Sequence, residues 1–158
     1  MSRHVRPTVR VQEADFDLAA EVSALTQGRG DVGAVVTFAG LCRDEGGTLA
    51  ALELEHYPGM AEREMAKVAD EALSRWPLTG LSVIHRFGRI AVGDNIVLVV
   101  AASSHRDAAF DAASYMMDFL KTRAPFWKKE HRRDGTKGGW VAARTADEKS
   151  ARRWDDEG

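Results

Sequence analysis

The chain has 158 residues, of which 44% are hydrophobic and 29% charged, so it has the size and composition of one ordinary globular domain. Its formal net charge of −2 is unlike that of a general nucleic-acid binder, which is basic as a whole. The single cysteine, Cys42, excludes an internal disulfide and a cysteine-rich metal site.

The N-terminal half of the chain predicts strands and helices in turn. Alternating residues at 5–12 favour a strand, and residues 15–30 favour a short helix with an aspartate near its start and glycine beyond its end. The β-branched, apolar segment 33–43 predicts a buried strand, which the sequence DEGG ends. Residues 49–57 alternate between an apolar face and an acidic face, so they predict a half-exposed strand.

The middle of the chain predicts one long helix followed by two strands. Apolar residues recur at helical spacing over 60–76, and Pro77 follows as a stop signal. Residues 81–90 and 95–104 each predict a strand, and a turn at Gly93 joins them.

The C-terminal part predicts a second strong helix and a hairpin. Residues 105–123 have helical spacing, and Pro125 ends this helix because proline disfavours the helical conformation of the residue before it. Residues 126–144 predict two strands around the glycine-rich loop DGTKGG. A capping pattern predicts a last helix over 145–154, followed by a polar tail at 155–158.

Strands that come in adjacent pairs between helices predict an α+β fold, with a mixed or antiparallel sheet, packed helices and a C-terminal β-hairpin. No repeat or linker divides the chain, so we expect one domain over residues 1–158. The N-terminus has no apolar core of signal-peptide length, and the longest apolar run, at 96–102, is too short to span a bilayer. We therefore expect a cytoplasmic protein that does not bind membranes.

Basic residues are concentrated around the break at Pro125. Lys121 falls in the last turn of the predicted helix and Lys128 on the predicted strand beyond it, so the two elements can bring both lysines to one anion-binding pocket. A lysine near a helix C-terminus is also favoured by the helix dipole, so a purely structural role stays open for each of them.

The junction between the strand at 95–104 and the next helix is a second place for an anion. Backbone N–H groups at the start of a helix favour anions, and His105 and Arg106 would add donors there. An ordinary strand–helix junction, capped by Ser104 or Asp107, explains the same residues.

Cys42 and Arg43 lie at the end of the predicted strand 33–43. Arg43 could reach a ligand at the sheet edge, or pair with Asp44 or Glu45 in solvent. A lone cysteine on a strand is more often a small hydrophobic residue than a nucleophile. The chain has no CxxC, HExxH, GxGxxG or P-loop pattern, so we expect neither a metal site nor a dinucleotide cofactor.

Five segments together carry a resemblance to a known family: GAVVTFAGLCRD, LELEHYPGM, RWPLTGLSVIHRFGRIAVGD, SSHRDAAF and FLKTRAPFWKKE. In this order they resemble the large, catalytic subunits of molybdopterin synthase, from about residue 33 to residue 154. One departure is Leu41-Cys42 before Arg43, where the family often carries a lysine and a valine.

The resemblance implies an α/β-hammerhead-type fold and a sulfurtransferase without a cofactor. Enzymes of this family convert cyclic pyranopterin monophosphate (precursor Z) into molybdopterin by installing the two sulfurs of a dithiolene. The sulfur arrives as a thiocarboxylate on the C-terminal Gly-Gly of a small ubiquitin-like subunit. The resemblance also implies a homodimer of large subunits within a heterotetramer, with no nucleic-acid or membrane partner.

Carried over by motif, the resemblance implies catalytic roles for Lys121 and Lys128 and a substrate-binding set made of Leu41, Cys42, Arg43, His105, Arg106, Lys121, Lys128, Lys129 and Glu130. A pocket that holds a cyclic phosphate and an anionic tail together requires clustered cations. Neighbouring cations disfavour one another's charged form, which favours a lysine acting as proton donor, base or nucleophile. Lys121 is the leading candidate for acid/base work or transient acyl capture, and Lys128 for positioning the substrate and stabilising charge.

A second interpretation is a non-catalytic module that binds an acidic peptide or a nucleotide through the same basic residues. A basic RNA-binding surface is weaker still, because the chain lacks an aromatic-rich RNA-binding motif.

Overall fold

The computed structural model describes residues 4–123, 125–140, 152, 154 and 155. Strands and helices alternate along the chain, as the α+β prediction requires. In order they are β1 (Thr8–Gln12), α1 (Leu18–Thr26), β2 (Ala34–Leu41), the 3₁₀ turn η1 (Glu45–Gly47), β3 (Leu49–His56), α2 (Met60–Arg75), β4 (Leu78–Arg86), β5 (Gly88–Ala91), β6 (Asn95–Ser103), α3 (Arg106–Arg123) and β7 (Phe126–Arg132).

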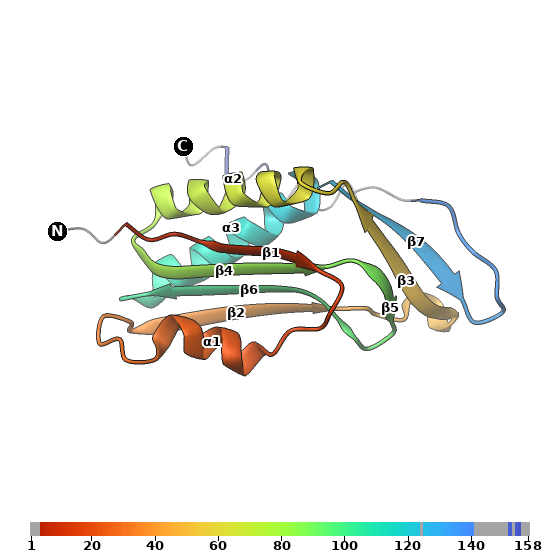
Figure 1. The fold of residues 1–158 in the computed structure, drawn as a ribbon, viewed down its shortest axis with the longest axis horizontal. Coiled ribbons are helices and arrows are strands. Elements are labelled where there is room, and N and C mark those ends of the chain that lie inside the picture. The colour runs from red at the N-terminus through yellow and green to blue at the C-terminus, as the bar shows by residue number, and fades with distance from the viewer. Residues whose placement is uncertain (1–3, 124, 141–151, 153, 156–158) are drawn as a thin grey trace.

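The strands form two sheets. The larger sheet has the order β1-β4-β6-β2, in which only the β1–β4 pair is parallel. The smaller sheet has the order β5-β3-β7 and is antiparallel throughout. Helices α2 and α3 lie on one face of the larger sheet and α1 on the other, while the smaller sheet extends beyond one end (Figure 1). The C-terminal end of α3 therefore lies next to the junction of the two sheets.

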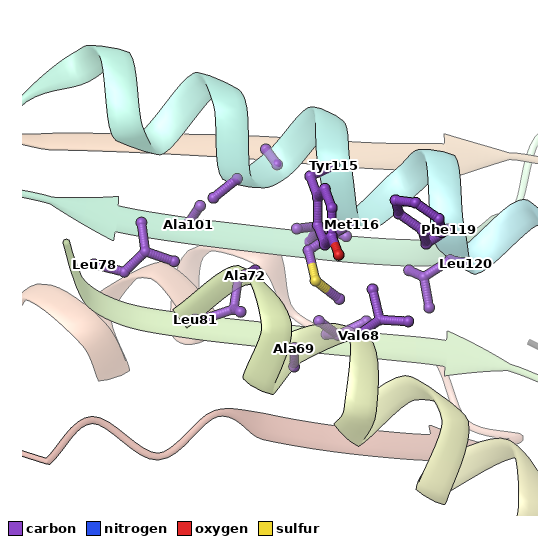
Figure 2. Close-up of a cluster of buried hydrophobic side chains, with 14 of the residues drawn as sticks. Val68, Ala69, Ala72, Leu78, Leu81, Ala101, Tyr115, Met116, Phe119 and Leu120 are labelled. Atoms are coloured by element: carbon purple, nitrogen blue, oxygen red, sulfur yellow. The ribbon is translucent and has the colours of Figure 1, made fainter. Parts of the chain in front are cut away.

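The main core lies between the helix pair and the larger sheet. Val68 and Ala72 of α2 and Met116 of α3 face Leu81 of β4 in this layer (Figure 2). Side chains at helical spacing form this face, because residues three and four apart lie above one another on a helix. Each large buried apolar side chain contributes about 1.5–3 kcal/mol. This packing holds α3 in place up to its last turn, where the buried Leu120 precedes the exposed Lys121.

The strand predicted within residues 33–43 is confirmed as β2, but the prediction that it is buried is wrong. Strand β2 lies at the edge of the larger sheet, and Phe38 is 40% exposed and Leu41 52% exposed. Val35 and Val36 do pack against the cores on the two sides of the sheet. The apolar sequence predicted cover on both faces, but a local pattern does not show that a strand has a neighbour on one side only.

The strand predicted at 81–90 is two strands. Residues up to Arg86 belong to β4 in the larger sheet, whereas β5 belongs to the smaller sheet. Gly88, the first residue of β5, has a φ of 89°, a conformation that residues with a side chain rarely adopt. The division at Gly88 carries the chain from one sheet to the other.

In the C-terminal hairpin, the chain pairs back onto β7 earlier in the sequence than predicted. After β7, Gly135 adopts a φ of 85°, and Lys137 forms an isolated bridge with His131, whereas Trp140 is not in a strand. Residues 141–144 of the predicted second strand lie outside the described residues, as does most of the predicted helix at 145–154. Trp154 is described: it is buried, and its Nε1 donates to Asp118 over 2.5 Å.

Candidate active site

A pocket of about 250 Å³ lies where the two sheets meet the C-terminal end of α3. Residues of the larger sheet, the smaller sheet, the loop after β2 and α3 all contribute to its walls. Its lining consists of Leu41, Arg43, Glu45, Leu49, Leu52, Ile96, Lys121, Lys128 and Glu130. The structure thus brings together five residues that the sequence singled out: Leu41, Arg43, Lys121, Lys128 and Glu130.

The two lysines reach the pocket from two elements. Lys121 lies in the last turn of α3, and Lys128 lies on β7, which pairs with β3 so that Lys128 is opposite Leu54. Glu130 is two residues further along β7 and shares the face of Lys128, because side chains alternate along a strand. Among the described residues, the side chain of Lys121 makes no ion pair or hydrogen bond with the protein.

A neutral histidine lies close to Lys121. The ring of His85 stacks on Phe126 with 3.7 Å between centroids, and its Nδ1 lies 2.8 Å from the carbonyl oxygen of Arg86. Because a carbonyl only accepts, Nδ1 carries the proton and donates this bond. The pKa of His85 is lowered to about 4, mainly by burial and also by the charge of Lys121, while the bond to Arg86 opposes the shift. The ring is therefore neutral at pH 7 and adds no charge beside Lys121.

Arg43 is already engaged by a carboxylate of the pocket. Its Nη2 lies 2.6 Å from Oε1 of Glu45, so the pairing that the sequence left open is made with Glu45 rather than Asp44. Glu45, like His85, was not singled out as a site residue by the sequence, and its only signal was its place beside Arg43.

Cys42 belongs to the core rather than to the pocket. Its side chain is 2% exposed and packs with Leu49, Leu54 and Ile90 behind the pocket wall. Burial raises the pKa of the Cys42 thiol, although the nearby charge of Lys128 opposes this shift. The thiol is therefore protonated near neutral pH, which suits packing and not nucleophilic attack.

Three of the residues expected at the site lie elsewhere in the single chain. His105 and Arg106 stand at the start of α3, and the helical rise places Arg106 about 22 Å along the axis from Lys121. Lys129 points to the other face of β7, where its Nζ lies 4.8 Å from the ring centroid of Trp140. Within one chain, these three side chains do not line the pocket with Lys121.

Two absences apply to the described residues only. None of their helices is long and apolar enough to cross a membrane. No three of their His, Cys, Asp and Glu side chains are grouped so that they could hold a metal ion.

Fold and site together define a two-sheet α+β protein with a cationic pocket at the sheet junction. A sequence model for the family described as MoaE protein matches residues 11–123, and the chain belongs to this family. A molybdopterin synthase catalytic subunit from Mesorhizobium japonicum is 68% identical over 154 residues, which cover 98% of this chain and 97% of that protein.

Solved structures agree with this assignment. A molybdopterin biosynthesis MoaE protein from Burkholderia ambifaria superposes with a TM-score of 0.81 at 46% identity, covering 94% of this chain and 98% of that one. Molybdopterin synthase from Staphylococcus aureus has a TM-score of 0.76 at 30% identity, covering 84% and 95%. The fold class expected from the sequence is confirmed.

Proposed function

We propose that this chain is the catalytic subunit of molybdopterin synthase, a cytoplasmic sulfurtransferase that converts precursor Z into the dithiolene of molybdopterin. The observation that carries the proposal is the pocket that gathers Arg43, Lys121 and Lys128 at the sheet junction. A second support is the high identity, over nearly the whole chain, to a protein that bears this name.

The sulfur donor is a small ubiquitin-like subunit, whose C-terminal Gly-Gly thiocarboxylate enters the pocket. The substrate phosphate and this tail are both anionic, so the pocket stabilises them with fixed cations. Lys121 is placed for proton transfer or acyl capture, because its amine has no protein partner among the described residues. Lys128, fixed on β7, positions the substrate and stabilises its charge.

His105 and Arg106 act in the pocket of a second copy of the chain. In a two-fold homodimer the two chains contact each other through the same surface. If the two α3 helices pack antiparallel in this contact, the start of one helix lies beside the end of the other. The exposed apolar side chains on this side support such a contact: Phe38 of the edge strand β2 and Phe110 of α3, which is 59% exposed. The heterotetramer then consists of this homodimer with one small subunit for each pocket.

Reconstitution tests the proposed activity. The purified chain, precursor Z and thiocarboxylated small subunit are mixed, and the dithiolene product is identified by mass. A catalytic subunit yields product, whereas a non-catalytic module that binds an acidic peptide forms the complex and yields none. A small subunit that lacks its last two glycines serves as the control, since it keeps a globular docking surface and should support no turnover.

Cys42→Ala is expected to leave turnover close to that of the unchanged protein, because the partner supplies the sulfur and the thiol is packed in the core. The lost packing should lower the free energy of unfolding by about 1 kcal/mol. Thermal unfolding and the product assay measure the two effects. A folded Cys42→Ala protein that forms no product would show that the thiol takes part in the reaction.

A further inference from the structure

Glu45 is out of place in a pocket for anions. It lines the pocket together with the three cations, and its Oε1 lies 2.6 Å from Nη2 of Arg43. The other carboxylate of the lining, Glu130, lies 3.9 Å from Arg132 and makes no ion pair with a cation of the pocket among the described residues. Of the two carboxylates in the pocket lining, Glu45 is therefore the one that pairs with Arg43, the residue expected to bind the substrate.

The loop that carries Glu45 is held in place at Asp44 and is unconstrained by neighbouring atoms at Gly46 and Gly47. Asp44 accepts from the backbone N–H of Leu49 over 3.0 Å and from Arg133 Nη2 over 2.7 Å, which ties this end of the loop to the smaller sheet. Gly46 and Gly47 follow with φ of 79° and 77°, and no atom lies within 4 Å of where either Cβ would be. The loop thus has room and backbone freedom for Glu45 to move while Asp44 stays in place.

The side chains of the pair are exposed, Arg43 by 77% and Glu45 by 41%. An ion pair so accessible to solvent is weak, so a stronger anion can displace it. Glu45 accepts one hydrogen bond from Nη2 of Arg43, whereas a guanidinium can bind a phosphate group through two parallel N–H···O bonds.

We infer that Glu45 competes with the phosphate group of the substrate for Arg43 and so lowers the affinity of the pocket for phosphate. In the empty pocket its carboxylate serves as an internal substitute for the ligand, and a phosphate group must displace it to bind the guanidinium of Arg43. This inference rests on the proposed function, because it takes the phosphate of precursor Z as the group that Arg43 receives.

The test is a double-mutant cycle on phosphate binding. The dissociation constant of inorganic phosphate is measured by NMR titration for the unchanged chain, Glu45→Gln, Arg43→Ala and the double variant. Glu45→Gln should bind phosphate about two- to fivefold more tightly, the range that an exposed ion pair contributes. In the Arg43→Ala background the gain should shrink to the general effect of removing one carboxylate from the pocket, because the guanidinium for which Glu45 competes is gone.

Two control variants distinguish the effect of the Arg43–Glu45 pair from the general electrostatic effect of removing a carboxylate. Glu64→Gln removes a carboxylate that pairs with Lys67 on α2 over 3.4 Å, and phosphate affinity should stay unchanged. Glu130→Gln removes the other pocket carboxylate, and any gain should be the same with and without Arg43.

Three outcomes would overturn the inference: an unchanged affinity in Glu45→Gln, a gain that is equally large in the Arg43→Ala background, and no phosphate binding by any of the proteins. The product assay on the unchanged chain stands apart from these titrations. Product formation without an effect of Glu45→Gln on phosphate would refute the role of Glu45 and leave the proposed function intact.

Discussion

Lys121→Arg is expected to fold, to bind the small subunit and precursor Z, and to form almost no product. Arginine keeps the positive charge at the end of α3, but it stays protonated throughout the working pH range and cannot exchange a proton or capture an acyl group. Loss of an acid or base group lowers turnover by about a hundredfold or more. Lys121 is exposed at the pocket, so the longer side chain has room and core packing is not disturbed.

Lys128→Arg is the matched control for this change. Lys128 lines the same pocket from β7 and is proposed to act through its charge, which arginine retains. Its loss should therefore appear more in the affinity for precursor Z than in the rate of the bound complex. Single-turnover assays and binding measurements on both variants separate the two cases. Near-normal turnover by Lys121→Arg would reduce Lys121 to an electrostatic role.

The two long helices could be predicted from the sequence because each carries a continuous apolar face. Helix α2 was predicted over 60–76 and α3 over 105–123, within one residue of their observed bounds at each end. The break at Pro125 was also sufficient to separate Lys121 from Lys128 into two elements. The spacing of apolar residues along a helix and the effect of proline on the residue before it are local properties, so both can be recognised directly in a sequence.

Which strands are neighbours is not a local property. The exposure of Phe38 depends on the edge position of β2, which has no second neighbouring strand in the part of the chain that the structure describes. The two-sheet division at Gly88 depends on how β5 pairs with β3. The closeness of His85 to Lys121 likewise depends on the packing of α3 and Phe126 over the end of β4.

The separation of Arg106 from Lys121 could have been foreseen. A helix over 105–123 is about 27 Å long, so residues at its two ends cannot share one small pocket within the same chain. The same length, with the exposed edge strand, supports a site that two chains complete.

Mixing two defective variants is therefore expected to restore activity. Lys121→Ala removes the proton-transfer group and Arg106→Ala removes a donor to an anion, so turnover should fall by about a hundredfold in the first and about tenfold or more in the second. In a dimer of one chain of each kind, one pocket combines the intact Lys121 of one chain with the intact Arg106 of the other. The second pocket of that dimer carries both defects.

Random reassembly after denaturation and refolding of an equal mixture gives about half mixed dimers, and half of their pockets are intact, so about a quarter of the normal activity should return. The product assay is run on the refolded mixture and on each variant refolded alone. Lys121→Ala mixed with Lys128→Ala is the matched control, since both residues line the same pocket of one chain and no intact pocket can form. No recovery in the Lys121→Ala and Arg106→Ala mixture would show that each chain supplies its own complete site. Recovery in the control would show that refolding itself, or a pocket that combines Lys121 and Lys128 of different chains, restores activity, and it would contradict the proposed arrangement.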